Sequence, residues 1–218
     1  MSAVRGPEPV SARGDRFVER GARIVATSAT EMDPMSGAVV LGIDPGTAIL
    51  GFAVVADHGG NLDLVECGTI TTSARMGLGE RLRTLHAGIA DVVSRHHPTE
   101  LAIEKLFFSR NVTSALAVGQ ARGVAILAAA EEGLVVEEYT PAEIKQAIAQ
   151  YGNARKEQIQ EMVRVLLGLR TIIEPDDAAD AAAIAICHHH SRRGRAMHAE
   201  LVGTQAATAR TRRKVARG

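Results

Sequence analysis

The sequence predicts an α/β domain in which helices flank a mixed five-stranded sheet. The first part of the core contains short apolar segments separated by Pro-Gly and Gly-Gly turns, which is typical of antiparallel strands joined by hairpins. Later apolar segments alternate with longer helix-forming segments, as in sheets whose faces are covered by helices. With 218 residues, 46% of them hydrophobic, the chain has enough apolar material for such a core.

The boundaries of the expected elements come from turn residues and helix-start signals. The first strand ends at Pro45-Gly46, and Gly59-Gly60-Asn61 separates the second strand from the third. Thr140-Pro141-Ala142-Glu143 has the pattern of an N-cap followed by a helix start. The expected strands cover residues 38–44, 50–56, 63–72, 100–104 and 134–139. The expected helices cover residues 78–95, 112–131, 141–150, 154–167 and 177–191.

Four carboxylates occupy positions that suit metal ligands. Asp44 and Glu104 each end an apolar strand, and Asp177 and Asp180 share one face of the Ala-rich helix that follows Pro175. The helix dipole favours acids in a first turn, but it does not account for acids in an otherwise almost wholly apolar helix, where they need a partner. Mg²⁺ or Mn²⁺ is the natural partner, because both ions prefer oxygen ligands.

Four acids are about what a pair of such ions requires. In a two-metal site one ion activates the attacking water and the other stabilises the leaving 3′-oxygen of an in-line displacement at phosphorus. The products are a 5′-phosphate and a 3′-hydroxyl, which a ligase can join. Asp44 taken alone also has a structural interpretation, since an Asp before Pro-Gly often bonds the turn backbone.

Five motifs, in this order and with these spacings, resemble the RuvC family, the bacterial Holliday-junction resolvases, over residues 38–190. They are Leu41-Gly42-Ile43-Asp44-Pro45-Gly46, Ala102-Ile103-Glu104, Ser114-Ala115-Leu116, Gly119-Gln120-Ala121-Arg122-Gly123 and Asp177-Ala178-Ala179-Asp180. The resemblance implies a ribonuclease H-like fold and a crossover junction endodeoxyribonuclease that nicks four-way DNA junctions symmetrically as a homodimer. It also implies two Mg²⁺ or Mn²⁺ ions in each active site and the branch-migration proteins RuvA and RuvB as partners.

Carried over to this sequence, the resemblance implies that Asp44, Glu104, Asp177 and Asp180 are the catalytic metal ligands. Asp176 adjoins Asp177, and either of the two could face the metal; the family spacing favours Asp177.

The resemblance also implies contacts with DNA. Phe107 matches an aromatic residue at the junction centre, where a base can stack on it, although a core Phe is the alternative. Arg110 matches a basic position in the loop that follows. Lys145 and Lys156 match basic residues near the scissile phosphate, where a cation offsets charge that develops in the transition state. Arg122 suits either a DNA contact or the dimer interface.

The resemblance covers the middle of the chain, so we expect residues 38–191 to form the nuclease domain. Residues 1–37 lack sustained periodicity and are expected to be a disordered extension, or a start assigned too early, since Met35 stands just before the fold. Residues 191–218 contain eight Lys or Arg and one acid, a formal charge of +7 that leaves −7 on residues 1–190. We expect residues 192–218 to be a disordered basic tail that either adds salt-sensitive DNA affinity or is merely solvated.

The remaining sequence features favour the cytoplasm as the location. The chain has no apolar run of the roughly 20 residues that span a membrane, and no secretory signal. Cys67 and Cys187 are expected to be free thiols. The run Cys187-His188-His189-His190 suggests a soft-metal site, but consecutive residues splay around a helix. The other interpretation is a helix end whose His side chains complement the dipole.

Three other functions share some of these features with a junction resolvase. The first strand and its turn also resemble actin-like ATPases, which need a second domain to clamp a nucleotide. YqgF-like nucleases that act on RNA share the first strand and the late acid, but they lack the Gly119–Gly123 segment. A non-catalytic junction-binding protein would be expected to have lost at least one of the four acids.

Overall fold

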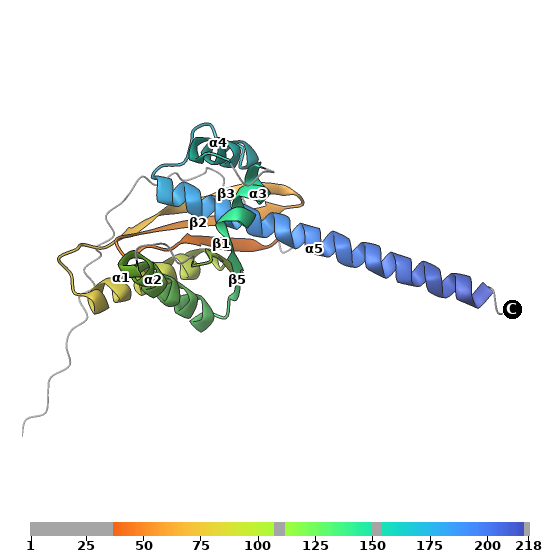
Figure 1. Cartoon of the computed structure of the whole chain (residues 1–218), viewed down its shortest axis with the longest axis horizontal. Coiled ribbons are helices and arrows are strands. Elements are labelled where there is room, and N and C mark those ends of the chain that lie inside the picture. The colour runs from red at the N-terminus through yellow and green to blue at the C-terminus, as the bar shows by residue number, and fades with distance from the viewer. Residues whose placement is uncertain (1–36, 107–111, 150–153, 216–218) are drawn as a thin grey trace, which may run out of the picture.

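The computed structural model describes residues 37–106, 112–149 and 154–215 (Figure 1). Within these residues five strands form one sheet in the order β3-β2-β1-β4-β5. The strands are β1 (Val39–Asp44), β2 (Ile49–His58), β3 (Asn61–Thr71), β4 (Glu100–Glu104) and β5 (Val135–Tyr139). The helices are α1 (Leu78–His96), α2 (Val112–Glu131), α3 (Pro141–Ala149), α4 (Lys156–Leu166) and α5 (Asp176–Val215). The predicted α/β class with a mixed sheet is confirmed.

The pairing of the strands brings two of the predicted metal ligands to one edge of the sheet. β2 pairs antiparallel with both β1 and β3, whereas β4 pairs parallel with both β1 and β5. Ile43 of β1 lies opposite Ile103 of β4. The next residue of each strand is an acid, so Asp44 and Glu104 leave the sheet side by side at the carboxyl ends of two parallel strands.

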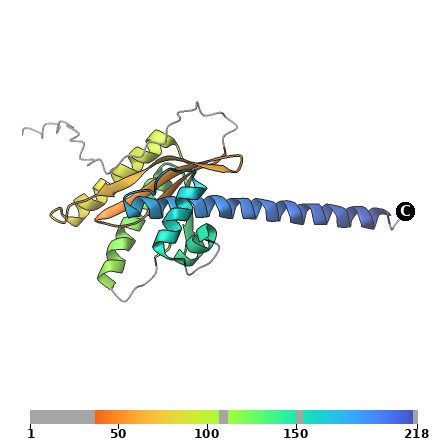
Figure 2. The ribbon, with the colours of Figure 1, turned by 90° about the horizontal axis from the view of Figure 1, so that it is seen from above.

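Helices cover both faces of the sheet. Helices α1 and α2 pack on one face, and α3, α4 and α5 pack on the other (Figures 1 and 2). Alternation along the central strand follows this division, because Val40 packs in the α5 layer, whereas Leu41 and Ile43 pack in the α1–α2 layer. Both faces of the sheet are therefore buried under helices. A functional site can form instead at the carboxyl ends of the strands.

Two glycines let α5 approach the sheet closely. A Cβ atom on Gly42 of β1 would lie 2.2 Å from the carbonyl oxygen of Ala181, and one on Gly51 of β2 would lie 2.0 Å from that of Asp177. Both distances are far shorter than a van der Waals contact, so only glycine fits at either position. The helix backbone thus rests directly on β1 and β2, and this contact places the first turns of α5 beside Asp44.

The predicted bounds agree with the structure within two residues for every strand and for α1 to α4. The C-terminal helix is the exception, because α5 continues to Val215 across residues that were expected to be a disordered tail. Arg192 and Arg193 dock it, with an Arg192–Glu100 distance of 3.1 Å and an Arg193–Asp57 distance of 2.7 Å. The expected extension over residues 1–37 lies outside the described residues except for its last residue.

The histidine run lies in the middle of α5, so its interpretation as a helix end is wrong. His188 Nδ1 lies 2.9 Å from the Tyr139 hydroxyl, and His189 Nε2 lies 3.1 Å from the Val55 carbonyl oxygen. His190 Nδ1 lies 3.1 Å from the Ala147 carbonyl oxygen. The three rings thus diverge toward β5, β2 and α3, as expected for consecutive residues on a helix. Both cysteines are free and buried.

Candidate active site

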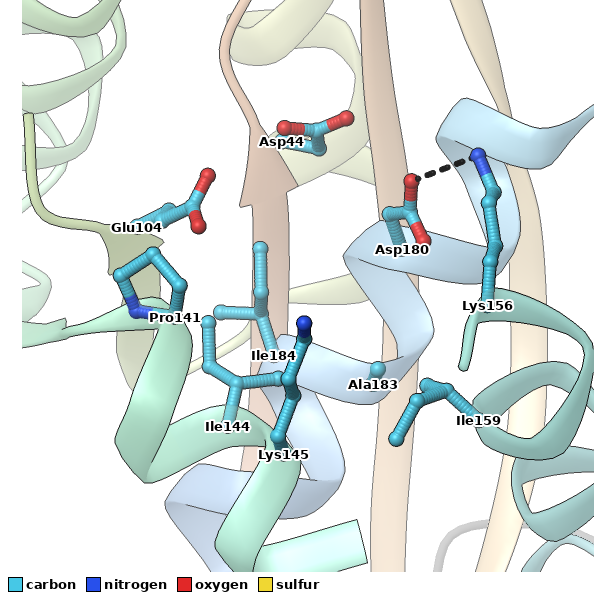
Figure 3. Close-up of a pocket in the computed structure, with 10 residues that line it drawn as sticks. All are labelled: Asp44, Glu104, Pro141, Ile144, Lys145, Lys156, Ile159, Asp180, Ala183 and Ile184. Atoms are coloured by element: carbon cyan, nitrogen blue, oxygen red, sulfur yellow. Dashed lines mark hydrogen bonds and ion pairs between the residues drawn. The ribbon is translucent and has the colours of Figure 1, made fainter. Parts of the chain in front are cut away.

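A pocket of about 270 Å³ opens at the carboxyl ends of β1 and β4 (Figure 3). Three acids from three elements line it: Asp44 of β1, Glu104 of β4 and Asp180 of α5. The apolar part of its wall comes from α3, α4 and α5, and two lysines complete the lining. The remaining lining residues are Pro141, Ile144, Lys145, Lys156, Ile159, Ala183 and Ile184. Residues distant in the sequence therefore form one charged pocket with an apolar wall.

The acids of this pocket repel one another. Burial raises the pKa of Asp44 to about 7, and the negative charges of Asp180, Glu104 and Asp177 add to the rise. The pKa of Glu104 is raised by burial and by Asp180. Burial also raises the pKa of Asp180. A cation placed among these carboxylates would relieve both the repulsion and the loss of hydration.

The donor chemistry suits a hard divalent cation, because every acid here offers oxygen ligands. Within the described part of the chain, no three His, Cys, Asp or Glu side chains already converge closely enough to hold an ion. The acids come from three elements and line the same pocket. These oxygen donors fit a divalent metal.

Asp176 and Asp177 face different surroundings. Asp176 is exposed and pairs with Lys156 at 3.0 Å, and it also accepts a hydrogen bond of 2.9 Å from Gln160. Asp177 is half-buried and contributes to the raised pKa values of Asp44 and Asp180, although it is not among the residues that line the pocket. These contacts agree with the preference for Asp177, whose role as a metal ligand stays a prediction.

Two of the four predicted DNA contacts lie at the pocket. Lys156 of α4 stands 3.3 Å from Asp180, and Lys145 of α3 rises on the side of the pocket nearer Glu104 (Figure 3). The charge of Lys145 lowers the pKa of Glu104 and so opposes the effect of burial. The pocket thus has cations on two sides. Phe107 and Arg110 lie outside the described residues.

Sequence reasoning missed the apolar wall and the role of Arg122. The Arg122 Nε group of α2 donates a hydrogen bond of 3.2 Å to the carbonyl oxygen of Glu104, and its guanidinium also pairs with Glu138. The contact supports the strand end that carries Glu104. One feature of the sequence pointed to the apolar wall, because Ile144 precedes Lys145 on the same helix. The sequence did not show that α3, α4 and α5 come together at the pocket.

The comparison with known families decides the identity. The family described as "Crossover junction endodeoxyribonuclease RuvC" matches residues 40–188. The chain belongs to the RuvC family. RuvC of Rubrobacter xylanophilus is 56% identical over 155 residues, which are 71% of this chain and 87% of that protein. RuvC of Chloroflexus aggregans is 56% identical over 151 residues, which are 69% and 92% of the two chains.

Solved structures agree with this assignment. The structure titled "T. thermophilus RuvC in complex with Holliday junction substrate" matches with a TM-score of 0.69 and 40% identity, over 72% of this chain and 95% of that one. The yeast mitochondrial Holliday junction resolvase Ydc2 matches with a TM-score of 0.54 and 13% identity, a likeness of fold. The ribonuclease H-like architecture is thereby confirmed.

Membership of the RuvC family makes the protein a crossover junction endodeoxyribonuclease, a hydrolase that cleaves DNA and depends on a divalent metal. The alternatives of an RNA-directed nuclease and of a non-catalytic junction-binding protein are not favoured. Among the described residues, no helix combines the length and apolar character that crossing a bilayer would need.

Proposed function

We propose that this protein resolves Holliday junctions by paired, symmetric hydrolysis of two opposed strands near the crossover, in recombination and DNA repair. One observation carries the proposal: Asp44, Glu104 and Asp180 meet Lys145 and Lys156 at a single pocket in a RuvC-family fold. The products are nicked strands with 5′-phosphate and 3′-hydroxyl ends. The protein would work in the cytoplasm, with RuvA and RuvB moving the junction toward it.

The metal centre would be held by Asp44, Glu104, Asp177 and Asp180, with two Mg²⁺ or Mn²⁺ ions in each site. When bound, such ions activate the attacking water and stabilise the leaving oxygen. The four carboxylates come from two strand ends and the first turns of one helix, so the fold fixes their mutual placement. Rigid placement matters because a two-metal site requires ions roughly 3.5–4 Å apart.

The lysines and the apolar wall would act on the substrate. Lys145 and Lys156 lie on two sides of the pocket, where their charges would attract the scissile phosphate and offset charge that develops on it. Ile144, Ile159 and Ile184 make the wall beneath them apolar, and an apolar wall excludes loosely held water. Phe107 would stack on a base at the junction centre and Arg110 would contact the backbone nearby.

The exposed surface of helix α2 supports the proposal that the protein is a homodimer. One face of α2 packs in the α1–α2 layer of the core through Ala121, Ala125, Ala128 and Ala129. Leu116 is 62% exposed and Leu127 is 52% exposed, so two large apolar side chains face outward. We infer that these two side chains contribute to a protein interface. A two-fold dimer through this helix would present two active sites to a junction that has the same symmetry.

The decisive experiment is cleavage of a synthetic four-way DNA junction beside a linear duplex of the same sequence. Both substrates are incubated with EDTA, Mg²⁺ or Mn²⁺, using wild type and Asp44→Asn. We expect metal-dependent, symmetric nicks in the junction alone, sealable by ligase and absent in the variant. Binding without cutting in either metal would contradict the proposal, and cutting confined to RNA would favour a YqgF-like activity.

A further inference from the structure

We propose that Asp176 is a positioning residue that holds Lys156 at the edge of the pocket, so that Asp180 remains available to the metal. The proposal rests on the function proposed above and concerns a residue outside the four predicted metal ligands. The Asp176 Oδ2 atom lies 3.0 Å from Lys156 Nζ. The Asp176 Oδ1 atom accepts a hydrogen bond of 2.9 Å from Gln160 Nε2.

The two helix starts explain this contact. Helix α4 begins at Lys156 and α5 begins at Asp176, and the first turns of both helices meet beside the pocket. Lys156 and Gln160 are four residues apart, so they project from the same face of α4. One carboxylate oxygen of Asp176 pairs with Lys156, and the other accepts a hydrogen bond from Gln160. With both oxygens engaged by one helix face, the carboxylate has a defined orientation.

Lys156 pairs with two acids, Asp176 and Asp180, which lie in different surroundings. Besides Asp176, its ammonium group lies 3.3 Å from Asp180 Oδ2. Asp180 lines the pocket and is a predicted metal ligand, whereas Asp176 is exposed and pairs with α4. In this structure the ammonium is therefore the cation nearest to Asp180 among the contacts described. A divalent ion and Lys156 would compete for the same carboxylate.

Asp176 decides the outcome of that competition. When a metal takes Asp180, Lys156 keeps Asp176 as its partner and stays at the pocket edge, close enough to act on a phosphate. Without the Asp176 carboxylate, Asp180 is the acid that still pairs with Lys156 among the described ion pairs, and the ammonium stays where it hinders the metal. The residue would thus act through Lys156 and not as a ligand.

The test is a double-mutant cycle measured by direct Mn²⁺ binding, with free Mn²⁺ followed by electron paramagnetic resonance. We expect Asp176→Asn to weaken Mn²⁺ binding about two- to fivefold, the range accessible to exposed ion pairs. In the Lys156→Ala background we expect the same change to have almost no effect. Equal weakening in both backgrounds would overturn the proposal, because Asp176 would then act as a general negative charge or as a ligand.

Glu161→Gln is the matched control. Glu161 is an exposed acid on α4 whose partner, Arg164, lies 2.6 Å away on the same helix and away from the pocket lining. Its loss removes one charge and one exposed ion pair without touching Lys156, so Mn²⁺ binding should not change. Asp176→Glu, which keeps the charge, should restore binding at least in part. Thermal unfolding of each variant checks that the fold is intact.

A second readout separates this proposal from the proposed function. At saturating Mn²⁺, Asp176→Asn should lower kcat for junction cleavage about two- to fivefold with little change in KM, and cause no further loss in the Lys156→Ala background. Failure of wild type to cut any junction would count against the proposed function. Wild-type cutting with Asp176→Asn equal to wild type in both Mn²⁺ affinity and kcat would overturn the positioning role alone.

Discussion

At the scale of single residues, the pocket concentrates negative charge where solvation is poor. The Asp44 carboxylate has three acidic neighbours, and its pKa of about 7 measures how strongly burial and those neighbours oppose its charge. Asp44 and Glu104 were predictable as a pair because each one ends an apolar strand. Their proximity follows from the parallel β1–β4 register. The choice between Asp176 and Asp177 was not predictable in the same way, because it depends on contacts with α4.

Metal removal provides a test of this charge balance. In EDTA at pH 8, Asp44→Asn should unfold several degrees above wild type, since the variant loses a carboxylate whose charge is opposed by burial and by the neighbouring acids. Adding Mn²⁺ should raise the melting temperature of wild type more than that of the variant. Differential scanning calorimetry measures both effects. Equal metal-induced shifts would show that Asp44 does not bind the ion.

Phe107 lies outside the described residues, so its predicted role in stacking on a base has to be tested by measuring cleavage. Phe107→Ala should slow cutting at the crossover about 5- to 100-fold, the equivalent of losing one stacked base, while binding to linear duplex changes little. Single-turnover cleavage and duplex titration separate the two quantities. Phe108→Ala is the neighbouring control. An unchanged cutting rate in Phe107→Ala would contradict the stacking role and favour the alternative that Phe107 is a core residue.

At the scale of elements, strand and helix positions were predictable where glycine and proline mark the turns. The hairpin between β2 and β3 shows why, because Gly59 and Gly60 have φ values of 62° and 114°, which suit glycine. The end of α5 was not predictable from its basic composition. Ala and Arg both favour helix, and the docking of Arg192 and Arg193 onto Glu100 and Asp57 depends on the tertiary fold.

The contact between α5 and β1 should tolerate no side chain at Gly42. Gly42→Ala places a Cβ atom 2.2 Å from the Ala181 carbonyl oxygen, so the helix must move away from the strand and carry Asp180 with it. We expect a loss of about 2–3 kcal/mol in the free energy of unfolding, together with weaker Mn²⁺ binding. Urea unfolding and Mn²⁺ titration measure the two. Gly79→Ala, a helical position with open space, should be neutral or stabilising.

The contact between α1 and β3 should depend on pH. Burial opposes ionisation of Glu66, but its hydrogen bonds with Arg95 and His96 outweigh that effect and lower its pKa. An acid with a depressed folded pKa stabilises the fold above its unfolded value and loses that contribution as the pH falls through the folded value. Glu66→Gln should therefore cost about 1–2 kcal/mol at pH 7. The difference from wild type should shrink below about pH 4 in thermal unfolding.

At the scale of the whole molecule, one helix joins the active site to the basic end of the chain. α5 contributes Asp177 and Asp180 at its start, packs across the sheet through its middle, and then projects beyond the domain (Figures 1 and 2). The family match ends at residue 188, and the projecting part lies beyond it. Two of its arginines, Arg192 and Arg193, are engaged with core acids.

Truncation tests whether the more distal basic residues bind DNA. Removing residues 196–218 deletes five basic residues and one acid while keeping Arg192 and Arg193. If the segment neutralises phosphates, the slope of log affinity against log salt should flatten by about 0.9 for each phosphate that the truncated protein leaves unpaired. Junction binding measured from low to moderate salt provides the slope. An unaltered slope would leave the segment without this role, and cleavage at low salt serves as the control for an intact domain.

The order of the acids along the chain has a consequence for how the enzyme is made. Asp44, Glu104 and Asp180 belong to the first strand, the fourth strand and the last helix, so the pocket draws on both ends of the domain. A polypeptide that is still being synthesised has no complete pocket until α5 has emerged and settled onto Gly42 and Gly51. Prematurely terminated products that end before Asp180 therefore lack one wall of this pocket.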